Sequence, residues 1–183
     1  MSDDKNIKLI NETTILFNDE IDGESATLLN SLIIEAETNS QWACVKYGIP
    51  APPIRLKINS RGGTVYDAIS VVDTITSTRC VDVITEINGF CASSAVLISV
   101  SGNKRLMSSN SIMVWHPMSW GAWGTKEYME DRSEESKKLD NICKKIILNN
   151  SNLSKKQLKK MGKRETSLTA MDCLKYGLVD EII

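Results

Sequence analysis

Hydrophobic positions recur along the chain with two different periods, which predicts an alternation of strands and helices. Short apolar runs at 13–17, 54–58 and 81–87 are typical of buried strands. The segments between them have helical spacing instead. One begins at Asp22, and its apolar face carries Leu28, Leu29, Leu32, Ile33 and Ala36. The other follows a glycine pair, and its apolar face carries Val65, Ala68, Ile69, Val72 and Ile75. This order predicts an α/β fold with a largely parallel sheet and crossover helices.

The second half of the chain continues the pattern with shorter elements. We expect strands at 104–107 and 111–115, a long charged helix over 125–149, and a final strand at 178–183. Capping-box patterns at Ser154 and Thr169 predict two short helices. The segment 41–53 holds three of the four prolines and is expected to be a surface loop, while residues 1–11 are polar and expected to be mobile.

Composition narrows the class of protein. With 183 residues, 42% of them hydrophobic, the chain predicts a single soluble domain spanning 1–183. The net charge of −1 provides no basic field, so no nucleic-acid partner is expected. No apolar run reaches membrane-spanning length and the N-terminus lacks signal-peptide features, which predicts a cytoplasmic protein with no membrane contact. Five cysteines without CxxC spacing and a single histidine imply a reducing compartment, no metal site and no cofactor.

The candidate chemistry lies in the stretch 88–116. Gly89 ends a β-branched run and small residues follow, so we expect a strand, a tight turn and a helix start that carries Ser93. A serine there could attack a carbonyl, with the N–H of Ser94 holding the developing negative charge and His116 acting as the base. Small residues at a helix start also permit close packing, and a lone histidine is often structural. The glycine pair 62–63 has two interpretations of equal weight. It could let backbone N–H groups approach a ligand, or it could form a plain tight turn.

Three separated segments resemble the proteolytic subunit of the Clp protease, ClpP. They are 58–63 (INSRGG), 89–95 (GFCASSA) together with 110–117 (NSIMVWHP), and 168–180 (LTAMDCLKYGLVD). The similarity runs from about residue 13 to the C-terminus. It implies a ClpP/crotonase-like fold with stacked β-sheet turns and crossover helices, plus a long protruding helix.

The resemblance also implies a role for each site residue. Ser93 matches the nucleophile, His116 matches the general base, and Gly63 and Ser94 match the two backbone donors of the oxyanion hole. Glu165 stands where the family has the acid that orients the histidine, and glutamate can fill that role. Asp172 is the alternative acid, although it is also expected to cap a helix.

Partners follow from the same resemblance. It implies a peptide or unfolded-protein substrate and a homo-oligomer of heptameric rings, up to a tetradecamer. The short N-terminus and the inserted loop at 41–53 depart from the family, which leaves dependence on an AAA+ unfoldase open. These departures would suit a phage-type variant, so the host is a bacterium or a phage-infected cell.

Two other functions stay open at this point. The chain could be a catalytically impaired scaffold subunit, or a crotonase-fold enzyme acting on acyl-CoA. Trp120 and Trp123, set among glycines, are expected to form a contact surface.

Overall fold

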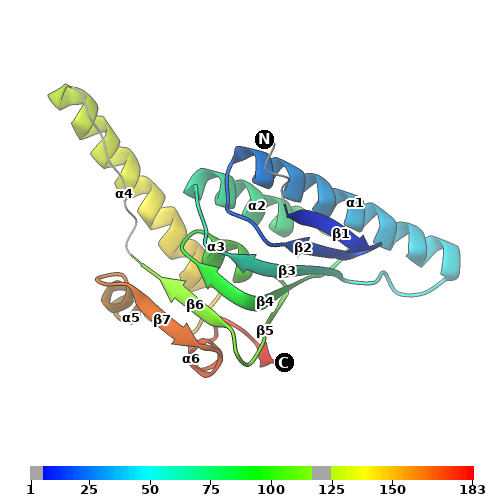
Figure 1. Cartoon of the computed structure of the whole chain (residues 1–183). Coiled ribbons are helices and arrows are strands. Elements are labelled where there is room, and N and C mark those ends of the chain that lie inside the picture. Colours follow the sequence, from blue (N-terminus) through cyan, green and yellow to red (C-terminus); the bar gives the residue numbers. More distant parts are fainter. Residues whose placement is uncertain (1–5, 117–124) are drawn as a thin grey trace.

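The computed structural model describes residues 6–116 and 125–183. Its strands are β1 (Ile7–Asn11), β2 (Thr14–Phe17), β3 (Ile54–Ser60), β4 (Val83–Ala92), β5 (Lys104–Met107), β6 (Ile112–Trp115), β7 (Thr166–Thr169) and β8 (Glu181–Ile182). Its helices are α1 (Gly23–Tyr47), α2 (Val65–Ser77), α3 (Ala95–Ser99), α4 (Lys126–Asn149), α5 (Lys155–Met161) and α6 (Ala170–Lys175). The order of strands and helices follows the predicted alternation (Figure 1).

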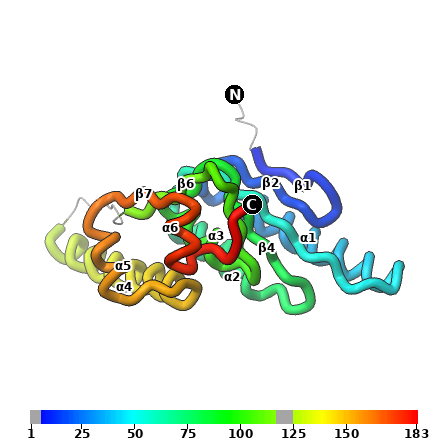
Figure 2. The backbone as a smooth tube through the Cα atoms, turned by 90° about the horizontal axis from the view of Figure 1, so that it is seen from below, coloured from blue at the N-terminus to red at the C-terminus, as the bar shows by residue number. Residues whose placement is uncertain are grey.

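The strands form an eight-stranded sheet in which most neighbours are parallel, as predicted. The main order is β1-β2-β3-β4-β5-β8, and β6 branches from β4 and pairs with β7. The pairs β1–β2 and β6–β7 are antiparallel. The intervening helices α1 and α2 act as crossovers between parallel strands and pack side by side against the sheet (Figures 1 and 2).

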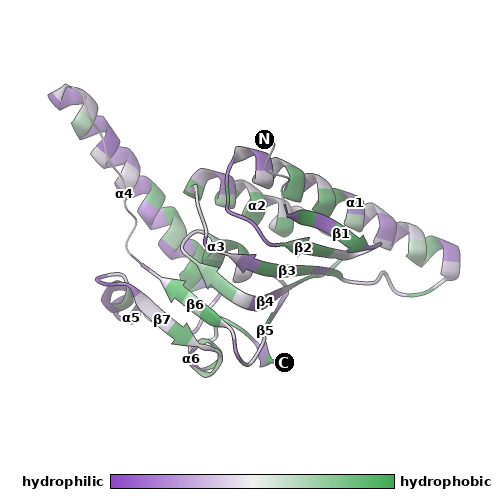
Figure 3. Cartoon of the chain, in the orientation of Figure 1, coloured by the Kyte–Doolittle hydropathy of each residue, from purple (hydrophilic) through white to green (hydrophobic). Residues whose placement is uncertain are grey.

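The core lies between this sheet and the helices. Leu29 and Ile33 of α1 are completely buried, as are Ala68 and Val71 of α2. Burying a side chain of the size of leucine stabilises the fold by roughly 1.5–3 kcal/mol, so these helical faces hold α1 and α2 against the sheet. Hydrophobic residues therefore concentrate at the sheet, while α4 is largely hydrophilic (Figure 3).

Helix α4 protrudes from the rest of the molecule, as the resemblance implied (Figure 1). The buried residues of α4 are Cys143 and Ile147, both in its C-terminal half. One contact braces the other half, since the Tyr66 hydroxyl of α2 donates a hydrogen bond to the Glu135 carboxylate of α4. The C-terminal half of α4 therefore packs on the core and can form a wall beside it.

Helix α1 is longer than predicted. The Asp22 side chain accepts a hydrogen bond from the Ser25 N–H in a capping box, which confirms the predicted start. The helix then continues through Tyr47 and ends at Gly48, which has a left-handed φ of 62°. The predicted loop over 41–53 was therefore wrong for 41–47, because the prolines begin only after Gly48 and do not interrupt the helix.

Strand β4 also continues further than predicted. Gly89 has a φ of 107°, and the strand passes through it to Ala92 instead of ending there. Residues 84–87 pair with β5, whereas 90–92 pair with β6. Gly89 therefore marks the point at which β4 changes its neighbour from β5 to β6. The predicted end of the strand at Gly89 was wrong.

The two ends of the chain are only partly as predicted. Residues 7–11 were expected to be polar and mobile, yet they form β1, an antiparallel partner of β2. The final strand is shorter than 178–183, because β8 covers only two residues. Trp120 and Trp123 lie outside the described residues. Within the described ranges, no helix is long and apolar enough to cross a membrane.

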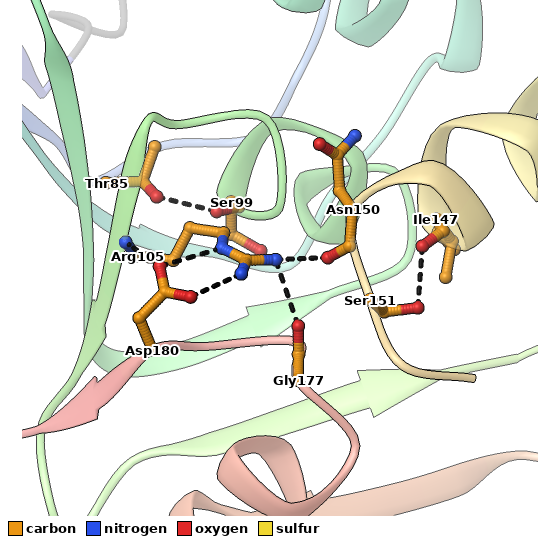
Figure 4. Close-up of polar contacts among 8 residues, drawn as sticks. All are labelled: Thr85, Ser99, Arg105, Ile147, Asn150, Ser151, Gly177 and Asp180. Carbon is orange, nitrogen blue, oxygen red and sulfur yellow. Dashed lines mark hydrogen bonds and ion pairs between the residues drawn. The ribbon is translucent and has the colours of Figure 1, made fainter.

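A partly buried arginine joins the C-terminal segment to the sheet (Figure 4). Arg105 of β5 forms an ion pair with Asp180, and its guanidinium also donates to the Gly177 carbonyl at 2.9 Å and to the Asn150 carbonyl. Hydrogen bonds from Arg105 hold the pKa of the Asp180 carboxyl below its ordinary value. The ends of α4 and α6 are thereby held against β5, the strand beside β4.

Candidate active site

Ser93 sits in a strained turn between β4 and α3. Its φ is 56°, and it is the only non-glycine residue with a positive φ in the described part of the chain. Its N–H donates to the Val114 carbonyl of β6 at 3.0 Å, which anchors the turn to the neighbouring strand. We expected Ser93 in the first helical turn, but it precedes Ser94, the N-cap of α3. A left-handed serine at a strand-to-helix turn is typical of an exposed nucleophile.

The glycine pair lies against this turn. A Cβ atom on Gly62 would approach the Ala92 carbonyl oxygen to 2.5 Å and the Ser93 Cβ to 2.7 Å. A Cβ on Gly63 would come within 2.0 Å of the Ile21 carbonyl oxygen. The Ser94 hydroxyl donates to the Gly63 carbonyl at 3.0 Å. Only glycine lets the backbone lie so close to the Ser93 turn at position 62 and to Ile21 at position 63. The glycine pair therefore does more than form a plain turn.

His116 reaches the same edge of the sheet from the adjacent strand. Strands β4 and β6 are parallel, with Ala92 opposite Val114. Ser93 directly follows the end of β4, and His116 directly follows the end of β6. Because parallel strands end at the same edge, the serine and the histidine leave the sheet side by side.

These residues line one cavity of about 460 Å³. Four of the five predicted site residues contribute to it, namely Gly63, Ser93, Ser94 and His116. Its other walls combine apolar and charged side chains. The lining is completed by Val65, Leu97, Trp115, Ser136, Lys137, Asp140, Cys143, Lys144, Lys159, Gly162 and Lys163.

Glu165, the fifth predicted residue, is exposed and is not among the lining residues of this cavity. It immediately precedes β7, whose antiparallel register with β6 ends at Trp115 opposite Thr166. The next position of that register sets Glu165 opposite His116. Directly opposed residues of an antiparallel pair carry their side chains on the same face of the sheet, so a continuation of this register by one position would place both side chains on one side.

Asp172, the alternative acid, is engaged elsewhere. Its carboxylate accepts hydrogen bonds from the Thr169 N–H at 3.0 Å and the Thr169 hydroxyl at 2.6 Å, forming the predicted capping box of α6. These bonds hold the pKa of the Asp172 carboxyl below its ordinary value. In the β6–β7 register, Thr169 lies opposite Ile112, at the end of β6 remote from His116. Asp172 therefore caps α6 near the end of β6 remote from His116, which makes it a poorer candidate than Glu165 for orienting the imidazole.

Sequence reasoning left the role of Gly62 open and missed the lysines of the cavity wall. The lysines come from α4 and from the α5 region, which are separated in sequence and meet only in the fold. Lys137 and Lys144 are seven residues apart on α4, which keeps them on one face of that helix, but the sequence does not show that this face meets the end of α5. In the described part of the chain, no cluster of three histidine, cysteine or acidic residues could hold a metal ion.

Comparison with known proteins identifies the family. A model of the Clp protease family matches residues 2–183. The chain is 33% identical to the ATP-dependent Clp protease proteolytic subunit of Streptococcus suis (strain 98HAH33), over 73% of this chain and 70% of that one. It is 36% identical to the subunit of Streptococcus mutans serotype c (strain ATCC 700610 / UA159), over 71% and 68%.

A solved structure supports the same fold. A point mutant of ClpP1 from Listeria monocytogenes superposes with a TM-score of 0.80 at 24% identity, covering 94% of this chain and 91% of that one. The predicted ClpP-like fold is thereby confirmed. The chain belongs to the Clp protease family of serine-type peptidases.

Proposed function

We propose that the protein is a serine endopeptidase in which Ser93 attacks the peptide carbonyl and forms an acyl-enzyme. His116 accepts the proton from the Ser93 hydroxyl and then donates it to the leaving amine. Water then releases the acyl group by the same route in reverse. The observation that carries the proposal is that Ser93 and His116 line one cavity from the ends of adjacent parallel strands.

The remaining site residues support this reaction. The backbone N–H groups of Gly63 and Ser94 are proposed to hold the oxyanion, an assignment favoured by the close approach of the glycine pair to the Ser93 turn. Glu165 is proposed to orient the His116 imidazole, an assignment favoured by the β6–β7 register.

The relatives suggest the biological setting. They are named proteolytic subunits of an ATP-dependent protease. We propose that residues 1–183 form one peptidase domain that assembles into homo-oligomeric rings, heptameric or paired as a tetradecamer. The proposed substrates are peptides or unfolded proteins in the cytoplasm, and dependence on an AAA+ unfoldase stays open because the N-terminus departs from the family.

A fluorophosphonate probe tests the proposed chemistry, because it reacts covalently with activated serine nucleophiles. We expect stoichiometric labelling of the native oligomer, located at Ser93 by peptide mapping, and its loss in Ser93→Ala. Ser109→Ala is the matched control, since Ser109 is exposed and lies outside the cavity. It should label like the wild type, and native mass spectrometry of the same samples should report the number of subunits.

The same samples address the other two functions. A folded oligomer with neither labelling nor peptide hydrolysis would overturn the peptidase proposal and leave a scaffold subunit. Binding of CoA that is unaffected by Ser93→Ala would instead indicate a crotonase-type enzyme.

A further inference from the structure

The cavity beside Ser93 has an unusual distribution of charge. Two of its lysines come from α4, Lys137 and Lys144, and two come from the end of α5 and the residues after it, Lys159 and Lys163. The only acidic residue that lines the described cavity is Asp140. This imbalance is local, because the chain as a whole has a net charge of −1.

Most of this positive charge has no ion-pair partner among the residues that the structure describes. Asp140 forms an i,i+4 ion pair with Lys144, which uses the one acidic group of the described wall. Lys137, Lys159 and Lys163 make no ion pair within 6–116 and 125–183.

The inner surface of the cavity is apolar and complements this rim. Val65, Leu97, Trp115 and Cys143 contribute hydrocarbon, ring and thiol surface next to Ser93. Burial raises the pKa of the Cys143 thiol to about 11, so this side chain adds no negative charge. A cavity lined by both apolar side chains and several lysines suits a short hydrocarbon stem that ends in a carboxylate.

We propose that this cavity selects peptides with a glutamate or aspartate side chain at, or next to, the residue whose carbonyl Ser93 attacks. The inference rests on the proposed function, since it names the substrate class of the same site. The methylene groups of the substrate contact the apolar wall, and its carboxylate lies among Lys137, Lys159 and Lys163. Lysines that surround a concave surface also focus their field on an approaching anionic chain.

The size of the preference follows from the exposure of these lysines. All three are solvent-exposed, and an exposed ion pair contributes little. We expect a peptide with glutamate to exceed its glutamine isostere by about fivefold in affinity and in kcat/KM at low ionic strength. The advantage should shrink toward onefold near 1 M salt, where the Debye length is about 3 Å.

Two measurements on the whole chain test recognition of an acidic side chain separately from the proposed serine chemistry. The first is the affinity of Ser93→Ala for fluorescent peptides that differ only in glutamate or glutamine, measured by anisotropy. The second is the ratio of kcat/KM values for the same peptides with the wild type. A preference in binding without any hydrolysis would support acidic recognition and refute only the peptidase. Equal affinity, or no measurable binding of either peptide, would overturn the inference.

Variants test the residues themselves. Lys137→Gln, Lys159→Gln and Lys163→Gln combined should abolish the preference for glutamate while fluorophosphonate labelling at Ser93 persists, which shows that the fold is intact. The matched control removes the same charge from α4 and α5 through Lys145→Gln, Lys156→Gln and Lys160→Gln, none of which lines the cavity. A control that loses the preference equally would attribute it to net charge and overturn the assignment.

Every peptide also has a carboxylate at its C-terminus. The test must therefore distinguish binding of a side-chain carboxylate from binding of the terminal carboxylate. All peptides above therefore carry an acetylated N-terminus and an amidated C-terminus. A preference seen only with a free C-terminus would mean that the lysines bind the terminal carboxylate, which contradicts the proposed recognition of a side chain.

Discussion

Trp115 and Thr166 are the last paired residues of the antiparallel ladder between β6 and β7. The next position of the register belongs to His116 on one strand and Glu165 on the other. Neither residue belongs to the ladder itself, but each is the first position beyond the end at which β6 and β7 stop pairing. This adjacency adds structural support to the assignment of Glu165 that the resemblance implied.

The first prediction concerns Glu165. Glu165→Gln should lower kcat by about 10²- to 10⁴-fold with little change in KM, because the amide cannot stabilise the imidazolium that forms during attack. Glu165→Asp should lie between this variant and the wild type, since it keeps the charge but shortens the side chain. Steady-state kinetics with a fluorogenic peptide measures both.

Asp172→Asn provides the control for Glu165. This change weakens the capping box of α6 but keeps an acceptor oxygen, so it should lower the unfolding free energy only slightly while kcat stays near the wild-type value. If Glu165→Gln were as active as the wild type and Asp172→Asn were inactive, the assignment of Glu165 would be wrong.

The second prediction concerns the contact between Gly62 and the Ser93 turn. Gly62→Ala should lower the free energy of unfolding by about 3 kcal/mol, because its Cβ would meet a backbone oxygen at 2.5 Å and the residue has a φ of 90°. Fluorophosphonate labelling should fall as well, since the clash displaces Ser93. Urea denaturation and labelling rates are the measurements.

Gly48→Ala is the matched control for Gly62→Ala. Gly48 also has a positive φ, of 62°, but a Cβ there would meet nothing within 4 Å. Its cost should be limited to backbone strain, about 1 kcal/mol, and labelling should be unaffected. Equal losses of unfolding free energy in Gly62→Ala and Gly48→Ala would show that the close approach of Gly62 to the Ser93 turn does not affect stability.

The third prediction is a pH dependence that arises from Asp180. Its carboxyl pKa is lower in the folded state because of hydrogen bonds from Arg105, so the unfolded chain binds its proton more readily. The pair therefore stabilises the fold above the ordinary aspartate pKa of 3.8, and this contribution is lost as the pH falls toward the lowered value.

Asp180→Asn isolates this effect. The Asp180 side chain is 37% exposed, so water screens the ion pair and the expected loss at pH 7 is only about 1 kcal/mol. The difference between the variant and the wild type should become smaller between about pH 5 and pH 3, as measured by urea denaturation. A difference that is constant over this range would assign the effect to the other hydrogen bonds of Arg105.

The fourth prediction concerns thiol reactivity. Burial raises the pKa of the Cys91 and Cys173 thiols to about 12, so neither thiol forms the reactive thiolate near neutral pH. Iodoacetamide should modify the exposed Cys80 first and leave these two unmodified in the native protein. Mass spectrometry after short exposure measures this, and unfolding in urea should make all five cysteines reactive. Rapid native modification of Cys91 would contradict its complete burial in the strand that leads to Ser93.

The sequence predicted best the features that depend on local chemistry. The helix starts at Asp22, Ser154 and Thr169 were correct because each cap is decided by a side chain and the backbone three residues later. The parallel sheet also followed from local alternation of strands and helices. These features need no knowledge of distant parts of the chain.

The errors occurred where tertiary contacts decide. Gly89 looked like the end of a strand, but β6 supplies a new partner that lets β4 continue. Residues 7–11 looked too polar for regular structure, but pairing with β2 makes them a strand. The lysine rim depends on α4 and α5 meeting around one cavity, which no local pattern shows.

The change of neighbours along β4 has a practical consequence for inhibitor design. The strand that leads into the Ser93 turn pairs with β3 and β5 along its first part and with β6 along its last part, and the turn is tied to β6 by a backbone hydrogen bond. An inhibitor directed at Ser93 therefore meets a backbone that the sheet holds in place. The varied side chains of the cavity come from the helical walls, so the chemical groups worth varying are those directed at α4 and α5.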